Sequence, residues 1–280
     1  MSSLPPLPTT TPSLSAPERA CREFAAGGRT ADPGNGWRWI VDGWNLFRQA
    51  PAMWVLLLVV FVVLLGALSF VPLLGGAAAA LLAPVLTGGL MFACREVDEG
   101  RSLQIEHLFA GFRQNTRQLA VVGVFHLVAS LVIVLVLVAF VGTNVGFGAL
   151  MGSMVGHPGM GAMTGGMLSV LLGGLLGVAL AVPVYAAIWF APALIVFHDM
   201  EAVAALKASF FAFLKNVLAM LVYSAILFVL AIIAAIPFSL GFLVLAPVVT
   251  ASIYTAYRDV FLASGTPAVL PTDAGPPPNL

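Results

Sequence analysis

The chain has 280 residues, of which 60% are hydrophobic and only 9% are charged, and its mean hydropathy is +1.04. This composition excludes a soluble globular protein, because so few charges could not solvate its surface, and it predicts an all-α integral membrane protein. The net charge is zero and indicates no particular partner. We expect contacts with membrane lipids and none with nucleic acid.

The chain begins with a polar stretch and continues into an amphipathic one. Residues 1–35 are rich in Pro, Ser and Thr, which predicts a disordered cytoplasmic tail. Trp37, Trp44 and Phe47 then share one apolar stripe at helical spacing. A helix of this kind lies flat in the headgroup layer, where tryptophan rings are favoured. We therefore predict an interfacial helix that ends near Arg48, where the chain turns into the hydrocarbon.

A membrane domain is predicted over residues 36–261, because this range contains apolar runs of roughly 20 residues that can each span a bilayer. Six crossings are predicted, at about 52–71, 75–94, 119–141, 168–197, 217–236 and 240–257. A second disordered cytoplasmic tail is predicted over 262–280, which is rich in proline.

The positive side chains are distributed unevenly between the connections. Every Lys and Arg lies before the first crossing, between the second and third, between the fourth and fifth, or after the sixth. Cytoplasmic loops carry the excess of Lys and Arg, so these zones are all expected to face the cytoplasm. The chain would then cross in pairs and keep both termini in the cytoplasm.

Short sequence repeats indicate three parallel helical hairpins, each preceded by an amphipathic interfacial helix. The stretch Leu82–Val85 recurs as Leu245–Val248, and a basic-acidic pair follows the proline at the same spacing in both copies, as Arg95-Glu96 and Arg258-Asp259. The predicted hairpins cover about 37–97, 103–199 and 201–260. The middle one is expanded by a Gly/Met-rich outer loop, predicted over 142–166.

Basic residues at the ends of the interfacial helices are candidates for contact with lipid headgroups. Each contributes about 1 kcal/mol beside anionic lipid. They could act as a collar that fixes depth and topology, or could recognise anionic headgroups specifically. The candidates are Arg38, Arg48, Arg113 and Lys215.

Prolines and one histidine are the candidate functional residues inside the crossings. Pro84 and Pro247 are expected near the bilayer midplane, and Pro192 is their counterpart in the middle hairpin. They could line a solute path, as broken helices do in transporters, or could only kink their helices. His126 is the ionisable residue expected well inside a crossing. It has no acidic partner there, so a neutral side chain bonded to a helix backbone or to Ser130 is expected.

The predicted outer loop carries a possible metal site. Thioethers and an imidazole suit Cu(I), and an extended chain with three residues per turn would bring them to one edge. The alternative is a flexible loop whose methionines contact the membrane surface. The residues concerned recur at every third position and are Met151, Met154, His157, Met160 and Met163.

The stretch GWRWIVDGWNLFRQAPAMW, the repeated Leu-Ala-Pro-Val and the closing Arg-Glu resemble an uncharacterised family of bacterial multi-helix inner-membrane proteins. They are also distantly similar to the membrane domain of glycerophosphoryl diester phosphodiesterases. The resemblance covers about 36–261 and implies a compact helical fold in the bacterial cytoplasmic (inner) membrane. No hydrolytic activity is implied, because the soluble catalytic domain of those phosphodiesterases has no counterpart here.

We expect a non-enzymatic inner-membrane protein that acts as a lipid-contacting or partner-organising scaffold. The sequence has no HExxH, GxSxG or P-loop motif, and no set of nucleophile, base or metal ligands for catalysis. The alternative is a permease or accessory protein for a small solute or a metal ion such as copper. No cofactor is expected, apart from Cu(I) in the metal alternative, and the expected partners are lipids, another membrane protein or a second copy.

Overall fold

The computed structural model describes residues 24–71, 74–113 and 115–262. The all-α fold class is confirmed, since no strand forms within these ranges beyond an isolated bridge between Phe24 and Leu262. The helices in chain order are α2 (Asn35–Gln49), α3 (Pro51–Ser69), α4 (Gly75–Asp98), the 3-10 helix η1 (Ile105–Phe109), α5 (Ala110–Arg113), α6 (Thr116–Met154), α7 (Pro158–Ile188), α8 (Ala191–His198), α9 (Ala202–Lys215), α10 (Val217–Ala235) and α11 (Phe242–Phe261).

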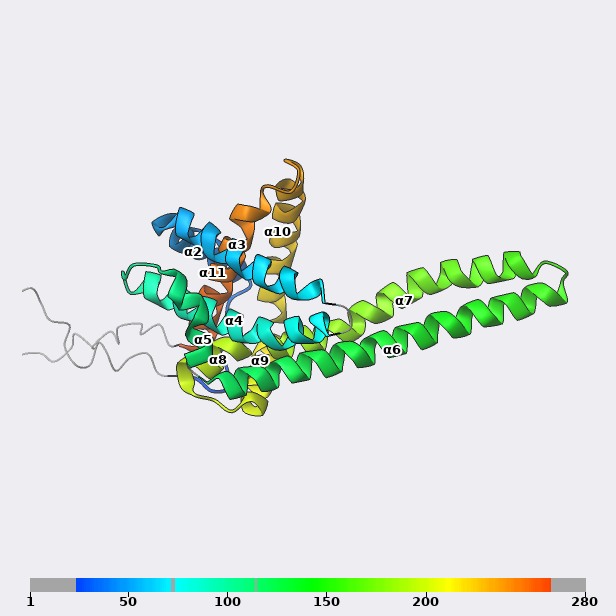
Figure 1. Ribbon diagram of the computed structural model, residues 1–280, viewed down its shortest axis with the longest axis horizontal. Coiled ribbons are helices and arrows are strands. Elements are labelled where there is room, and N and C mark those ends of the chain that lie inside the picture. Colours follow the sequence, from blue (N-terminus) through cyan, green and yellow to red (C-terminus); the bar gives the residue numbers. More distant parts are fainter. Residues whose placement is uncertain (1–23, 72–73, 114, 263–280) are drawn as a thin grey trace, which may run out of the picture.

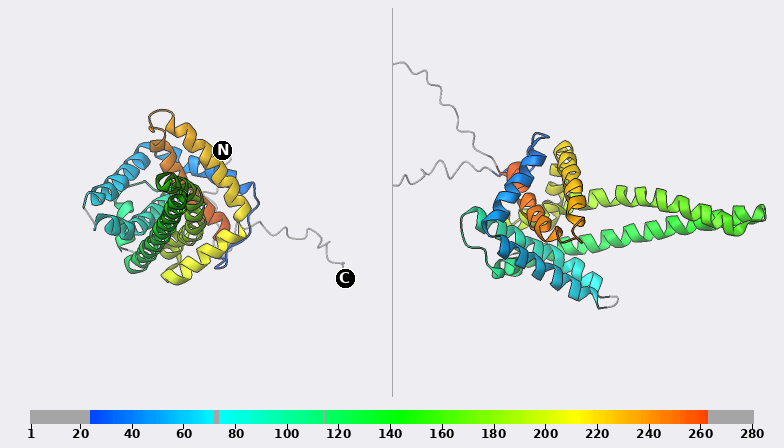
Figure 2. Two further views of the ribbon diagram at one scale, coloured as in Figure 1. Left: turned by 90° about the vertical axis from the view of Figure 1, so that its right-hand side faces the viewer. Right: turned by 90° about the horizontal axis from the view of Figure 1, so that it is seen from above.

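The helices form a compact base from which three pairs diverge. The antiparallel pair α6 and α7 leaves the base as a long hairpin that extends well beyond all other elements (Figure 1). The pair α3–α4 extends to the same side of the base as this hairpin, with α4 packed on α6, but diverges from it, whereas α10 runs across the hairpin direction (Figures 1 and 2). The long pair differs from the others in length, since α6 has 39 residues whereas α3 and α10 have 19 each.

Five helical stretches are long and apolar enough to cross a membrane. They are Pro51–Leu68, Gly75–Asp98, Thr116–Met154, Gly159–His198 and Val217–Ala235. The sixth predicted crossing, 240–257, does form a helix, but α11 does not meet the same criterion. Its lower hydropathy has a simple cause: it contains Thr, Ser and Tyr side chains and ends in a basic-acidic pair. Five membrane-capable helices are therefore established by length and composition.

The loop predicted over 142–166 is wrong. Helix α6 continues to Met154, α7 starts at Pro158, and three residues connect them. The glycines explain the difference, because they let two helix backbones touch: a Cβ at Gly161 would lie 2.0 Å from the Gly148 carbonyl oxygen. Contact between helices at small residues is characteristic of membrane proteins. The glycine-rich segment therefore packs as a helical hairpin instead of forming an extended loop.

The tail predicted over 1–35 is wrong for its last part, and residues 1–23 lie outside the described residues, as do 263–280 of the second tail. Residues 24–31, which we call the N-terminal strap, cross the base and contain a turn at residues 26–27. Ala25 N and Arg29 N donate to the last carbonyls of α11, and the Asn216 side chain bonds to Ala31 N at 2.6 Å. Gly28 has φ +65° and packs against Ala212, a conformation that favours glycine.

The three predicted interfacial segments are helical, and each packs against a helix outside its own predicted hairpin. Helix α2 packs on α11, η1 and α5 pack on α4, and α9 packs on α7 and α8. Only part of the predicted stripe of α2 is used in this packing, since Phe47 is buried while Trp37 and Trp44 are exposed, and the buried Trp39 lies outside that stripe. The stripe thus contributes to the protein core and leaves two tryptophans on the surface.

Candidate functional site

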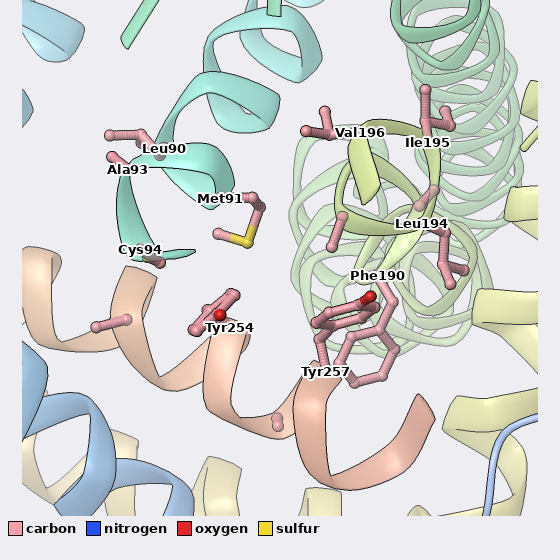
Figure 3. Close-up of a cluster of buried hydrophobic side chains, with 14 of the residues drawn as sticks. Leu90, Met91, Ala93, Cys94, Phe190, Leu194, Ile195, Val196, Tyr254 and Tyr257 are labelled. Carbon is pink, nitrogen blue, oxygen red and sulfur yellow. The ribbon is translucent and has the colours of Figure 1, made fainter. Parts of the chain in front are cut away.

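The ends of three helices meet in the centre of the base. Met91 and Cys94 of α4, Leu194 of α8, and Tyr254 and Tyr257 of α11 gather in one buried cluster (Figure 3). Basic-acidic pairs lie at the ends of these helices, namely Arg95-Glu96 and Arg258-Asp259 of the sequence repeat and His198-Asp199 at the end of α8. Burial of apolar area contributes about 25 cal/mol per Å² to stability. The cluster is therefore the structural centre of the base.

Ionic groups connect the helix ends around this cluster. Arg258 of α11 pairs with Asp98 of α4 at 2.5 Å, and the Tyr254 hydroxyl donates to the same carboxylate at 3.2 Å. Asp259 accepts hydrogen bonds from Asn35 and from the Trp39 indole, both at 2.8 Å. These contacts join α4, α11 and α2, which are far apart in sequence, and so fix the relative positions of the first and last parts of the chain.

The turn after α4 holds a second ionic group. Arg101 binds Glu96 through two hydrogen bonds of 2.6 Å and pairs with Glu99 at 2.5 Å. The Glu96 hydrogen bond, together with Glu99, raises the pKa of the Arg101 guanidinium. Arg101 is half exposed, so this group stabilises the local turn only modestly.

The N-terminal strap covers the end of α8. The Phe24 ring stacks on the His198 ring with a centroid distance of 3.7 Å, and His198 Nε2 hydrogen-bonds to the Tyr257 hydroxyl at 2.6 Å. Beside them, the Arg95 guanidinium lies between the Phe92 and Phe197 rings, at 5.0 and 4.8 Å. No sequence motif indicated this aromatic group, because Phe24 lies in a stretch whose composition is typical of disorder.

Ser209 is a second structural residue that sequence reasoning missed. It is fully buried on α9, accepts a hydrogen bond from Phe190 N at 3.0 Å and donates to Ala186 O at 2.8 Å. The hydroxyl thereby satisfies two backbone groups at the break between α7 and α8, where the predicted single crossing 168–197 is interrupted. A side chain inserted between helical backbone groups is a recognised cause of a kink.

The four headgroup candidates lie at the surface of the base in two different environments. Arg38 and Arg48 on α2 and Arg113 on α5 are exposed, and no ion pair forms to them within the described residues. Lys215 is also exposed, but its ammonium group donates to the Gly27 carbonyl of the strap at 2.7 Å. Three candidates are therefore available to an external anion, while the fourth contributes to holding the strap.

The prolines and the histidine lie on four different helices. Pro84, Pro192 and Pro247 are all buried, each in its own helix. His126 is partly buried on α6, and its ring lies 6.0 Å from the Tyr185 ring. The carbonyl freed by Pro84, that of Ala80, faces α6, as a Cβ at Gly123 would lie 3.0 Å from it.

The proposed copper ligands lie at the end of the long hairpin. Two methionines are in the last turns of α6, His157 is in the turn, and two methionines are in the first turns of α7. They are exposed on two helices and do not form the extended edge that we predicted; Met151, Met154, Met160 and Met163 are 41%, 75%, 66% and 75% exposed. Within the described ranges, no group of three or more His, Cys, Asp or Glu side chains could hold a metal ion.

Comparison with known proteins gives one informative relative. A Burkholderia thailandensis protein described as "Probable inner membrane protein BTH_II0599" is 31% identical over 247 residues, which cover 81% of this chain and 90% of the relative. No family model matches the chain, and no solved structure matches it. The expected resemblance to an inner-membrane family is supported, whereas none of these comparisons links the chain to the phosphodiesterase membrane domain.

The relative and the structure agree on the class of protein. The described helices provide several apolar segments of membrane-spanning length, and the similarity extends over most of both chains. The chain is an integral inner-membrane protein and belongs to the same family as the probable inner membrane protein of Burkholderia thailandensis.

Proposed function

We propose that the protein is a non-enzymatic scaffold that contacts lipids and organises partners in the inner membrane. In this proposal the chain crosses six times as three parallel hairpins, with the base and both termini at the cytoplasmic face. The observation that carries it is the separation of charge: the basic side chains belong to the base, whereas the far connections at 70–76, 142–166 and 236–241 contain no Lys or Arg. Positive charge is retained on the cytoplasmic side of membrane proteins.

The cyclic packing of the base supports three related units. Each interfacial segment packs on the returning helix of the preceding unit, and α2 of the first unit packs on α11 of the last. Equivalent atoms are used in two of these contacts: a Cβ at Gly111 would lie 2.0 Å from Val85 O, and a Cβ at Gly43 would lie 2.9 Å from Val248 O. Val85 and Val248 each follow the repeated proline. A ring closed in this way gives the three hairpins a common base.

A sixth crossing by α11 requires its polar side chains to be paired inside the protein. Ser252 hydrogen-bonds to the buried Tyr223 hydroxyl at 2.7 Å, and Thr255 donates to Trp39 O at 2.9 Å. Thr250 donates to Ala246 O within the helix at 3.0 Å. Because these groups are satisfied by neighbours, the lower hydropathy of α11 is compatible with a position in the hydrocarbon.

Lipid contact is supported by the surface of the base. Exposed Trp37 and Trp44 lie on the same helix as Arg38 and Arg48, and exposed Phe112 is next to Arg113. Aromatic rings and basic groups together are typical of the membrane interface. Three arginines would contribute about 3 kcal/mol beside anionic lipid, at about 1 kcal/mol each.

Retention of anionic lipid tests this part of the proposal. Wild-type protein and the variant Arg38→Gln/Arg48→Gln/Arg113→Gln would be inserted into nanodiscs of phosphatidylcholine with phosphatidylglycerol, and bound lipids counted by native mass spectrometry. We expect the triple variant to lose phosphatidylglycerol several-fold, and Arg101→Gln, whose charge is already paired, to retain it. Equal retention by the two variants would show that the arginines fix only the depth and topology of the protein and do not recognise anionic headgroups.

The permease alternative makes a different prediction about water. A permease needs a wettable path beside Pro84 and Pro247, whereas a scaffold does not. In a variant with Cys21 and Cys94 replaced by serine, single cysteines along 80–90 and 243–250 would be treated with a membrane-impermeant maleimide. We expect protection throughout, because Val85, Leu86 and Val248 are buried in the protein and the exposed Leu243 and Val244 would face hydrocarbon in this proposal. A run of labelled positions on one helix face would favour the permease.

A further inference from the structure

The long hairpin is too long for the membrane that its neighbours fit. Helices α3 and α10 have 19 residues each and are about 28 Å long, which matches a hydrocarbon core of about 30 Å. Helix α6 has 39 residues and is about 58 Å long. Even a tilt of about 40°, the upper end of the usual range, accommodates only about 40 Å. About 20 Å of the hairpin therefore projects beyond the hydrocarbon.

The projecting part, which we call the hairpin tip (residues 142–167), has an unusual surface. No Asp, Glu, Lys or Arg occurs between Gln118 and Phe197. The tip instead exposes large apolar side chains, namely Phe147, Leu150, Met151, Met154, Val155, Met160, Met163 and Met167. An exposed apolar surface of this extent outside the hydrocarbon marks an interaction site or an aggregation risk. The surface thus needs a cover that the chain itself does not provide within the described residues.

We propose that a second copy of this chain covers it, through side-by-side contact of two long hairpins. Two copies in one membrane present the same segments at the same depth and can pair about a two-fold axis along the membrane normal. The absence of charge makes the surface compatible with itself. The tip is about 20 Å long and about 20 Å wide across its two helices, so it presents about 400 Å². That area is half of the roughly 800 Å² per partner of a stable interface, so the contact must continue along the lower part of the hairpin.

The lower part of the same hairpin is shaped to continue this contact. A shallow apolar groove lies over Gly173, Gly174 and Gly177 on α7. A Cβ at Gly174 would meet no atom within 4 Å, and one at Gly177 would be at an ordinary 3.4 Å from Leu137. These glycines are therefore not needed for contact between α6 and α7. They would allow a helix of the second copy to approach closely, as small residues do in membrane dimers.

The long hairpin also has the rigidity that a docking surface requires. Gly148 and Gly161 bring α6 and α7 into backbone contact at the tip, and a Cβ at Gly165 would lie 2.4 Å from Asn144 O. A rod held by such contacts loses little conformational entropy on pairing. The inference rests on the proposed crossing of α6 and α7, and it is independent of the choice between scaffold and permease.

Native mass spectrometry of the full chain released from nanodiscs tests the proposal. Wild-type protein is expected at twice the chain mass of 29.2 kDa, and Met154→Glu/Met163→Glu, which places charge on the tip, at the single-chain mass with an unchanged melting temperature. Val203→Glu adds a charge at an exposed apolar residue of the base and should remain dimeric. Wild-type protein at the single-chain mass, or a double variant that remains dimeric, would overturn the proposal.

Cross-linking in the native membrane gives a second measurement. With Cys21 and Cys94 replaced by serine and the thiol oxidant diamide added, Met163→Cys should form an intermolecular disulfide, whereas Phe70→Cys, which is 88% exposed at the far end of α3, should not. Equal cross-linking at both positions would indicate random collision, and cross-linking of Met163→Cys only to a different protein would replace the second copy by that partner. If the protein is a monomer but its tip still reaches the periplasm, the dimer proposal is wrong and the scaffold proposal stands.

Discussion

Replacing Gly43 by alanine should destabilise the protein, because Gly43 is where the first unit closes the base against the last. A Cβ at this position would lie 2.7 Å from Ser252 N and 2.9 Å from Val248 O. Both are backbone atoms of α11 and cannot rotate away. Overpacking costs about 1–3 kcal/mol, and we expect the upper end here. Alanine regains about 1 kcal/mol of helix propensity, which leaves a net loss of about 2 kcal/mol.

The matched control is Gly66→Ala on α3, where a Cβ would meet nothing within 4 Å. Tryptophan fluorescence during heating of detergent-solubilised protein measures both variants. At about 2–4 °C per kcal/mol, Gly43→Ala should melt about 4–8 °C below wild type, and Gly66→Ala at or above it. Equal melting temperatures for the two variants would show that α2 does not pack closely on α11 at Gly43, and would contradict the closed base.

Three further predictions concern the base, the strap and the tip. Ser209→Ala should destabilise the protein by about 1–3 kcal/mol in denaturant titrations, because two buried backbone groups lose their partner; Ser153→Ala, an exposed site on α6, should have little effect. Lys215→Ala should speed trypsin cleavage after Arg29, because the Lys215 ammonium group donates hydrogen bonds to two carbonyls of the strap. Lys207→Ala is the control, and an equal cleavage rate in the two variants would show that Lys215 does not hold the strap. Cu(I) uptake in a competition assay should not fall when the tip ligands are replaced, because their side chains are exposed on two helices and a turn; a stoichiometric loss would restore the copper site. The residues replaced in that variant are Met151, Met154, His157, Met160 and Met163.

The helices could be predicted from the sequence because their signals are local. Uncharged apolar runs of about 20 residues identify membrane-spanning helices without any tertiary information. The amphipathic pattern likewise placed α2, whose range Asn35–Gln49 begins close to the predicted start. Which face of α2 meets lipid was harder to predict, because a helix can bury its stripe in protein or in lipid with the same periodicity.

Long-range packing accounts for what the sequence did not reveal. Glycine lowers the propensity of an isolated helix, so the segment 142–166 resembled a loop, but backbone contact between Gly148 and Gly161 outweighs that cost. The strap was missed for a similar reason: its order depends on Asn216 and Lys215, which lie almost 190 residues away. Ser209 was missed because no local pattern distinguishes a serine that bridges a helix break from one on a surface.

The central claim is that the chain crosses the membrane in pairs from a basic cytoplasmic base. Locating the end of the long hairpin on one side of the membrane tests it most directly. A dual reporter, active as a phosphatase only in the periplasm and fluorescent only in the cytoplasm, would be inserted at Gly156, in the turn between α6 and α7, and separately fused to the carboxyl end. If the chain crosses in pairs, the reporter at Gly156 should show phosphatase activity and the reporter at the carboxyl end should fluoresce. Fluorescence at Gly156, or phosphatase activity at the carboxyl end, would contradict a chain that crosses in pairs from a basic cytoplasmic base.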